Sequence, residues 1–227
     1  MSKGIFVTAT GTDIGKTYIS SLLVKALIKN KINAGYYKPV LSGAIVENGT
    51  LIPGDVDFVS RESGLKNKYE DLVTYVFKAP VSPHMASKLE NIKIEKENII
   101  DHYNRLKNKF DYTVVEGCGG IVCPLRIDTE QIHLTDIIKM MGLDIVIVAS
   151  SDLGTINSTV LTVEYARSCN IGIAGIILNN YEKENYLHDD NKEKIELLTG
   201  VKVIACVKKD DKDIEMTIEN CLELFSR

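Results

Sequence analysis

Gly15-Lys16-Thr17 is the residue pattern with the clearest chemical use in this sequence. It follows an apolar run at 5–7 and precedes apolar residues at helical spacing, so we expect a strand, a turn and a helix in that order. In such a turn, backbone N–H groups and the helix N-terminus bind phosphate, the lysine contacts the β- and γ-phosphates, and the threonine hydroxyl binds Mg²⁺. A phosphate-binding loop is therefore predicted, although Thr10 stands where this motif normally has its first glycine. A chance Gly-Lys-Thr in a surface turn is the alternative.

Two more charged residues follow expected strands. Lys38 comes after residues 34–37, and Glu116 comes after residues 112–115. Because the carboxyl ends of parallel strands meet at one edge of a sheet, both side chains are expected near the phosphates. A second lysine there would stabilise the phosphoryl group and a small anionic acceptor, and the carboxylate would hold Mg²⁺. The alternatives are a solvated lysine at a strand end and an acid outside the site.

Asp55 stands just after Pro53-Gly54, at the expected start of a helix. In that position an aspartate either caps the helix or provides another oxygen ligand for Mg²⁺. Asp57 lies close enough to be confused with it, and both alternatives stay open at this point.

Apolar runs alternate with helical stripes along the whole chain. Continuous apolar runs suit strands that are covered on both faces, and helical crossovers between strands imply a parallel sheet. We therefore expect an α/β fold of the P-loop NTPase class, in which helices cover both faces of a mostly parallel sheet and residues 1–227 form a single domain. Strands are expected at 5–7, 34–37, 112–115, 145–148, 172–178 and 201–207, and helices after 15, near 55, and at 99–106, 160–166 and 214–225.

The composition is ordinary for a globular protein, with 44% hydrophobic residues, 26% charged residues and a net charge of −4. A nucleic-acid-binding protein normally has a basic surplus, so no nucleic-acid partner is expected. No apolar run is long enough to span a bilayer and the N-terminus lacks the pattern of a signal peptide, so a cytoplasmic location without membrane attachment is expected. The five cysteines form no C-x-x-C pair, which favours buried or loop thiols over a disulfide framework or a structural zinc.

Taken together, these segments resemble the dethiobiotin synthetase family, and the similarity covers nearly the whole chain. The patterns K-P-x-x-S-G, S-P-H and V-E-G-x-G-G are more specific than the phosphate-binding loop because they occur in the family's order and spacing. The matching segments are 6–10, 15–17, 35–43, 79–84, 115–120, 124–125 and 153–157.

The resemblance implies a reaction. The family makes dethiobiotin from 7,8-diaminononanoate, CO₂ and ATP in the presence of Mg²⁺. A carbamate forms on one amine, its oxygen attacks the γ-phosphate to give a carbamic-phosphoric anhydride, and the second amine closes the ureido ring and expels phosphate. The sequence does not indicate which amine is carbamoylated first.

The resemblance also implies roles for particular residues of this chain. Lys16 and Lys38 would balance charge during phosphoryl transfer. Thr17, Asp55 and Glu116 would hold Mg²⁺. The implied contacts are, for ATP, Asp13, Ile14, Gly15, Lys16, Thr17, Tyr18, Asp55, Glu116, Gly117, Cys118 and Gly119; for the base, Asn179 and Asn180; and for the substrate, Thr12, Ser42, Gly154, Thr155, Ile156 and Asn157.

The family works as a homodimer with its sites at the subunit interface. Residues 154–157 open an expected helix, whose free N–H groups would bind the tail carboxylate of the substrate from the neighbouring subunit. An ordinary strand-to-helix turn, capped by Asn157 or Ser158, is the alternative.

One segment departs from the family pattern. Residues 205–208 read Ala-Cys-Val-Lys, whereas the family tends to have Gly-x-Ile/Leu-Pro there. The strength of adenine selection beside Lys208-Lys209-Asp210 is therefore open. No role is assigned to Tyr186 or His188, because the match to the family is loose between 181 and 198.

Three other functions compete with this interpretation. A partner-regulated ATPase switch of the MinD/ParA type would normally have an extra lysine at the position of Gly11. An ATP-dependent amidotransferase synthetase related to the cobyrinate enzymes would normally bring a glutaminase domain, for which 227 residues leave no room. A signalling GTPase is disfavoured because the chain has no N-K-x-D motif.

Overall fold

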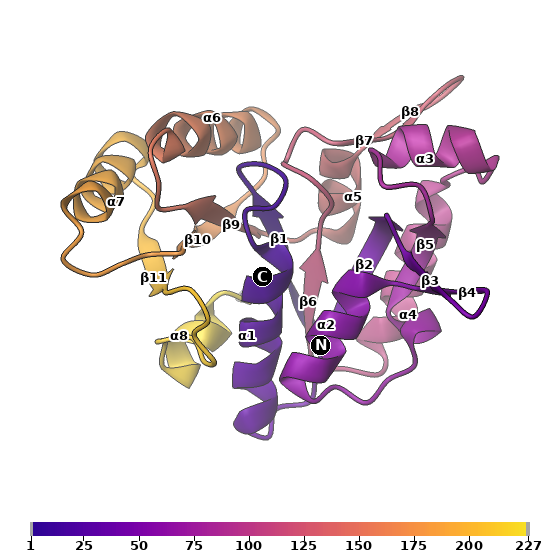
Figure 1. The fold of residues 1–227 in the computed structure, drawn as a ribbon, viewed down its shortest axis with the longest axis horizontal. Helices are drawn as coiled ribbons and strands as arrows, with labels where there is room; N and C mark the ends of the chain where they lie inside the picture. The colour runs from indigo at the N-terminus through magenta and orange to yellow at the C-terminus, as the bar shows by residue number, and fades with distance from the viewer. Residues whose placement is uncertain (1, 226–227) are drawn as a thin grey trace.

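The computed structural model describes residues 2–225. Within them, the main sheet consists of β1 (Lys3–Ala9), β2 (Ala34–Ser42), β5 (Val73–Phe77), β6 (Tyr112–Glu116), β9 (Ile145–Ser150), β10 (Ile173–Asn179) and β11 (Val203–Val207). These 7 strands lie in the order β11-β10-β9-β1-β6-β2-β5, and every neighbouring pair runs parallel (Figure 1). The parallel sheet predicted from the sequence is therefore confirmed.

Helices cover both faces of this sheet (Figure 1). They are α1 (Lys16–Lys29), α2 (Gly54–Ser63), α3 (Pro83–Glu90), α4 (Lys96–Lys107), α5 (Leu134–Met141), α6 (Thr155–Ser168), α7 (Tyr186–Thr199) and α8 (Ile218–Glu223). Helices α1, α2 and α8 pack against one face of the sheet in one apolar cluster, and α3 to α7 pack against the other face in a second cluster. Ile5 and Phe6 of β1 enter opposite clusters, as the two-residue period of a strand requires. None of the helices within 2–225 is long and apolar enough to cross a membrane.

β2 is longer than predicted, and the expectation that Lys38 ends a strand was wrong. The pairing of β2 with β6 stops before Lys38, but the strand continues to Ser42 beside β5. The backbone N–H of Lys38 donates to the carbonyl oxygen of Leu72, on the β5 side of the strand. Pro39, the next residue, faces the β6 side, where pairing has already ended, so its missing N–H leaves no gap in the sheet. Lys38 nevertheless lies level with Glu116, the last residue of β6, because the residues before them are paired.

The sequence analysis did not predict several elements of the structure. They include α3, α5, α7, the edge strand β5, a 3₁₀ turn (Tyr69–Asp71) and two hairpins, β3 (Ile45–Glu47) with β4 (Thr50–Ile52) and β7 (Pro124–Ile127) with β8 (Gln131–His133). The closing helix, expected from 214, begins only after Thr217. The hydroxyl of Thr217 accepts the backbone N–H of Asn220 and caps the helix at that point.

Candidate active site

The turn between β1 and α1 has the backbone that a phosphate-binding loop requires. Gly15 has a φ of 101°, and a Cβ added to it would lie 2.2 Å from Nδ2 of Asn179. Only glycine fits this position. The same Nδ2 donates to the carbonyl oxygen of Ile14 at 2.9 Å, so the end of β10 supports the loop. No side chain caps α1, which leaves the N–H groups of its first turn available to an anion.

Lys16 lies over the same turn. Its side chain is largely buried, and Nζ donates to the carbonyl oxygen of Gly11 at 3.2 Å. Burial and the nearby Lys38 ammonium lower the pKa of Lys16. A phosphate would counter both effects, because a negative charge next to an ammonium favours its charged form. The position of Lys16 therefore suits the predicted contact with the β- and γ-phosphates.

Lys38 lies between two carboxylates. Its Nζ is 2.7 Å from Oε1 of Glu116, 2.6 Å from Oδ2 of Asp55 and 3.0 Å from the carbonyl oxygen of Gly117. Burial of the side chain favours the neutral amine, but the two carboxylates outweigh burial and raise the pKa of Lys38. Burial likewise opposes ionisation of Asp55, and the Lys38 ammonium outweighs it and lowers the pKa of that carboxyl. Lys38 and Asp55 are therefore paired as ions.

Asp55 does not cap α2. The residue before the helix is Pro53, and no side chain makes a capping hydrogen bond there. Asp55 instead lies in the first turn of the helix and contacts Lys38. Of the two alternatives left open by the sequence, the geometry favours the one that places this carboxylate in the site.

Glu116 is fully buried and accepts hydrogen bonds from three side chains. Thr17 Oγ1 and Lys38 Nζ donate to Oε1 at 2.8 and 2.7 Å. The Tyr36 hydroxyl donates to Oε2 at 2.8 Å. Burial and the charge of Glu116 raise the pKa of Tyr36, so this hydroxyl keeps its proton. The sequence analysis missed Tyr36, although its spacing of two residues from Lys38 on one strand places both side chains on the same face.

The oxygen atoms gathered here fit a magnesium ion. Thr17 brings a hydroxyl, and Asp55 and Glu116 bring carboxylates that already hold a cation, the Lys38 ammonium. Mg²⁺ in nucleotide sites takes one or two carboxylates, hydroxyl and water oxygens, and phosphates. Thr17, Asp55 and Glu116 therefore stay the predicted ligands of a magnesium ion.

These residues open into a pocket of about 610 Å³ at the carboxyl edge of the sheet. A volume of this order suits a small-molecule ligand. Most of the residues assigned to ATP or substrate line it, whereas Ile14 and Gly117 contribute backbone carbonyls to the hydrogen bonds already described. The lining residues are Thr12, Asp13, Gly15, Lys16, Thr17, Tyr18, Lys38, Val40, Leu41, Ser42, Gly54, Asp55, Phe58, Glu116, Cys118 and Gly119.

The predicted contacts at 154–157 lie at the start of α6, outside this pocket. Thr155 is buried, and its hydroxyl donates to the carbonyl oxygen of Ser150 at 2.5 Å. Gly154 and Asn157 on either side of it are exposed. The backbone at this helix start is thus open to a molecule that lies outside the pocket of its own chain.

Residues of α7 hold two loops, one before α6 and one after β10. Nδ2 of Asn191 donates to the carbonyl oxygen of Ser151 at 2.9 Å. His188, which received no role from the sequence, is buried, and its Nδ1 accepts the backbone N–H of Glu182 at 2.9 Å. Its neighbour Tyr186 is almost fully exposed. His188 therefore has a structural role in the loop that follows β10.

The predicted base contacts lie at and just after the end of β10. Asn179 is buried, and its Oδ1 has no hydrogen-bond partner among the described residues. Asn180 is exposed. The segment after β11, which differs from the family pattern, folds toward α1. The Lys208 backbone N–H donates to Oδ2 of Asp211 at 2.8 Å, and the Tyr18 hydroxyl donates to the Asp211 carbonyl oxygen.

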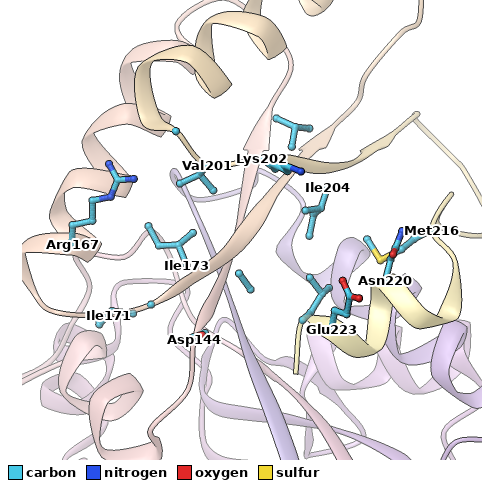
Figure 2. Close-up of a pocket in the computed structure, with 15 residues that line it drawn as sticks. Asp144, Arg167, Ile171, Ile173, Val201, Lys202, Ile204, Met216, Asn220 and Glu223 are labelled. Atoms are coloured by element: carbon cyan, nitrogen blue, oxygen red, sulfur yellow. The ribbon is translucent and has the colours of Figure 1, made fainter. Parts of the chain in front are cut away.

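A larger pocket, of about 1090 Å³, lies at the opposite edge of the sheet, where β10 and β11 begin (Figure 2). Arg167 of α6 and Glu223 of α8 lie on its two sides (Figure 2). The Arg167 guanidinium is already engaged, by the carboxylate of Glu164 at 2.7 Å and the Thr199 carbonyl oxygen at 2.6 Å. None of the predicted site residues lines this pocket, so we place no catalytic chemistry there.

Solved structures with low sequence identity share the fold. A ParA family ATPase from Chlorobium tepidum TLS has a TM-score of 0.57 at 16% identity and covers 100% of this chain and 91% of that one. A chain of the MinC:MinD cell division protein complex from Aquifex aeolicus has a TM-score of 0.56 at 14% identity, with coverage of 97% and 85%. At these identities the likeness concerns the fold alone.

Sequence comparisons are more specific. A family model described as an AAA domain matches residues 3–216. The protein called ATP-dependent dethiobiotin synthetase BioD in Clostridium botulinum (strain Alaska E43 / Type E3) is 47% identical over 225 residues, 99% of each chain. Its namesake in Clostridium perfringens (strain 13 / Type A) is 48% identical over 215 residues, 95% of this chain and 94% of the other. This chain belongs to the ATP-dependent dethiobiotin synthetase family.

Proposed function

We propose that this chain converts 7,8-diaminononanoate, CO₂ and ATP to dethiobiotin, ADP and phosphate, as a ligase of biotin biosynthesis. The observation that carries this proposal is the buried Lys38 ammonium, which contacts Glu116 and Asp55 and lines the pocket of the phosphate-binding loop. A second fixed cation beside the loop suits a reaction in which an anionic acceptor, the carbamate, meets the terminal phosphate.

The proposed reaction begins with a carbamate on one amine of the substrate. A carbamate oxygen attacks the γ-phosphorus, ADP leaves and a carbamic-phosphoric anhydride remains. The second amine attacks the carbonyl carbon, the ureido ring closes and phosphate leaves. Negative charge is redistributed over oxygens in each step, so the main task of the protein is to position the reactants and to balance this charge.

The two lysines divide that task. Lys16, which lies over the turn, would bind the β- and γ-phosphates. Lys38 stays charged because its carboxylate partners raise its pKa, and it would contact the carbamate and the phosphoryl group in transit. Thr17, Asp55 and Glu116 would hold Mg²⁺, which when bound neutralises charge on the phosphate oxygens.

The other ligands can be assigned by the chemistry of their surroundings. Thr12 and Ser42 line the pocket and would contact the diamine or its carbamate. Asn179, at the end of β10, and the exposed Asn180 after it would contact the base. The open helix start at 154–157 would bind the tail carboxylate of the substrate held by the neighbouring subunit of a homodimer.

We infer a cytoplasmic location from the cysteines. All five are free in the structure, including a pair in contact, and free thiols suit a reducing compartment. We also treat residues 1–227 as one P-loop domain that acts on small molecules, without a nucleic-acid or membrane partner.

Phosphate release is expected to require the diamine and CO₂ together. The acceptor oxygen exists only after CO₂ has reacted with the amine, so Mg·ATP with either compound alone should give little phosphate. The measurement is continuous phosphate release with neither, one or both compounds present. Rapid release with neither, or release stimulated only by a protein or membrane partner, would instead support a partner-regulated ATPase switch of the MinD/ParA type.

A further inference from the structure

Cys118 and Cys123 make a contact that the proposed reaction does not use. Their Sγ atoms are 3.7 Å apart, and the residues lie in the irregular segment that joins β6 to β7. Because a disulfide has an S–S distance of about 2.05 Å, a relative shift of roughly 1.7 Å would bring the two sulfurs to bonding distance. Both thiols are free in this structure.

The two residues differ in exposure: Cys118 is half-buried and Cys123 is buried. Cys118 lines the phosphate-binding pocket of about 610 Å³. Cys123 is only 6% exposed and belongs to the apolar cluster on the face of the sheet that α3 to α7 cover. A reagent that enters the pocket therefore meets Cys118 first, and Cys123 can react only with a sulfur that is already beside it.

We propose that Cys118 and Cys123 form a reversible dithiol–disulfide pair, through which low-molecular-weight disulfides (RSSR) inactivate the phosphate-binding site. The Cys118 sulfur attacks one sulfur of RSSR, which breaks the RSSR bond, forms a mixed disulfide and releases one RSH. The Cys123 sulfur then attacks Sγ of Cys118, forms the internal disulfide and releases the second RSH. The two protein thiols are oxidised, RSSR is reduced, and both thiol protons leave with the two RSH molecules.

Formation of this bond would disturb the groups around Lys38. Lys38 Nζ donates to the carbonyl oxygen of Gly117, the residue directly before Cys118, at 3.0 Å. It also donates to the side chain of Glu116, two residues before Cys118. A movement of Cys118 toward Cys123 strains this backbone. Since a misplacement of about 1 Å can cost on the order of a hundredfold in rate, we expect a loss of that size. This inhibition rests on the proposed function, whereas formation of the bond does not.

The test uses the full-length reduced protein and glutathione disulfide. The intact mass should fall by two hydrogen atoms, and peptide mapping without reductant should identify a Cys118–Cys123 link. Mg·ATP should slow the formation of this link, because a bound nucleotide covers Cys118. Turnover should fall on the order of a hundredfold and return after treatment with dithiothreitol.

Two variants make the outcome decisive. Cys123→Ala should keep its basal turnover and acquire one glutathione on Cys118 in place of the internal link. Cys206→Ala, which removes a thiol on β11, should form the link as the unaltered protein does. If the unaltered protein forms no link in excess oxidant, or if fully linked protein keeps its turnover, the proposal is overturned. Peptide mapping still decides whether the bond forms if the protein makes no dethiobiotin at all.

Discussion

Lys38→Met is expected to lower kcat for dethiobiotin formation on the order of 10²–10³-fold while Mg·ATP still binds, since the loss of one fixed charge-stabilising group has effects of this size. Lys38 is buried between Glu116 and Asp55, so water cannot easily replace its charge beside the reacting oxygens. Methionine keeps a long unbranched side chain but has no ammonium. The loss should appear in steady-state product formation, with ATP binding measured separately by calorimetry.

Stability must be measured alongside activity, because this substitution leaves two carboxylates near one another without their cation. Asp55 would lose the partner that lowers its pKa. Thermal melting should therefore show some destabilisation, and rates should be compared well below the melting temperature. Lys25→Met is the matched control, since Lys25 on α1 pairs with Asp213 and does not line the phosphate-binding pocket. A folded Lys38→Met protein with near-normal kcat would contradict the role given to this ammonium.

Glu116→Gln is expected to raise the Mg²⁺ concentration needed for half-maximal activity and to lower kcat. The carboxylate accepts from Thr17, Lys38 and Tyr36. A glutamine amide has only one acceptor oxygen, so its NH₂ group would face at least one of these three donors. It also brings no negative charge to a metal ion. The measurement is the initial rate as a function of Mg²⁺ at fixed ATP.

Two comparisons separate this effect from a general loss of packing. Tyr36→Phe removes one of the donors to Glu116 and keeps its charge, so it should shift the Mg²⁺ requirement in the same direction by a smaller factor. Glu164→Gln changes an exposed carboxylate that pairs with Arg167 and should leave the requirement unchanged. An unaltered Mg²⁺ dependence in folded Glu116→Gln would rule out Glu116 as a metal ligand.

Much of this site could be predicted because it is built where parallel strands end. Lys16 and Thr17 follow the turn after β1, and Glu116 is the last residue of β6, the neighbour of β1 in the sheet. Parallel topology alone therefore brings these side chains together. Lys38 was placed correctly beside them although β2 was predicted too short, because its level in the sheet depends on the pairing with β6 and not on where the strand stops.

The contacts that could not be predicted involve irregular segments whose course depends on packing. Asp55 contacts Lys38 only because α2 lies against the sheet. No local sequence pattern distinguishes an aspartate in this role from one that caps the helix. The contact of Cys118 with Cys123 depends in the same way on the path of the segment between β6 and β7. β5 is different. Its alternation of buried and half-buried residues from Val73 to Phe77 is a recognisable strand pattern that the sequence analysis overlooked.

The central claim is that an oxygen derived from CO₂ attacks the terminal phosphate beside Lys16 and Lys38. The most direct measurement is a single-turnover reaction of the unaltered protein with the diamine, Mg·ATP and freshly dissolved ¹³C¹⁸O₂, quenched before the oxygen label exchanges with water and analysed by mass spectrometry. We predict dethiobiotin that carries ¹³C and phosphate that carries one ¹⁸O from the carbamate. Labelled dethiobiotin with unlabelled phosphate would contradict the attack by the carbamate, and consumption of ATP without dethiobiotin would contradict the proposed function itself.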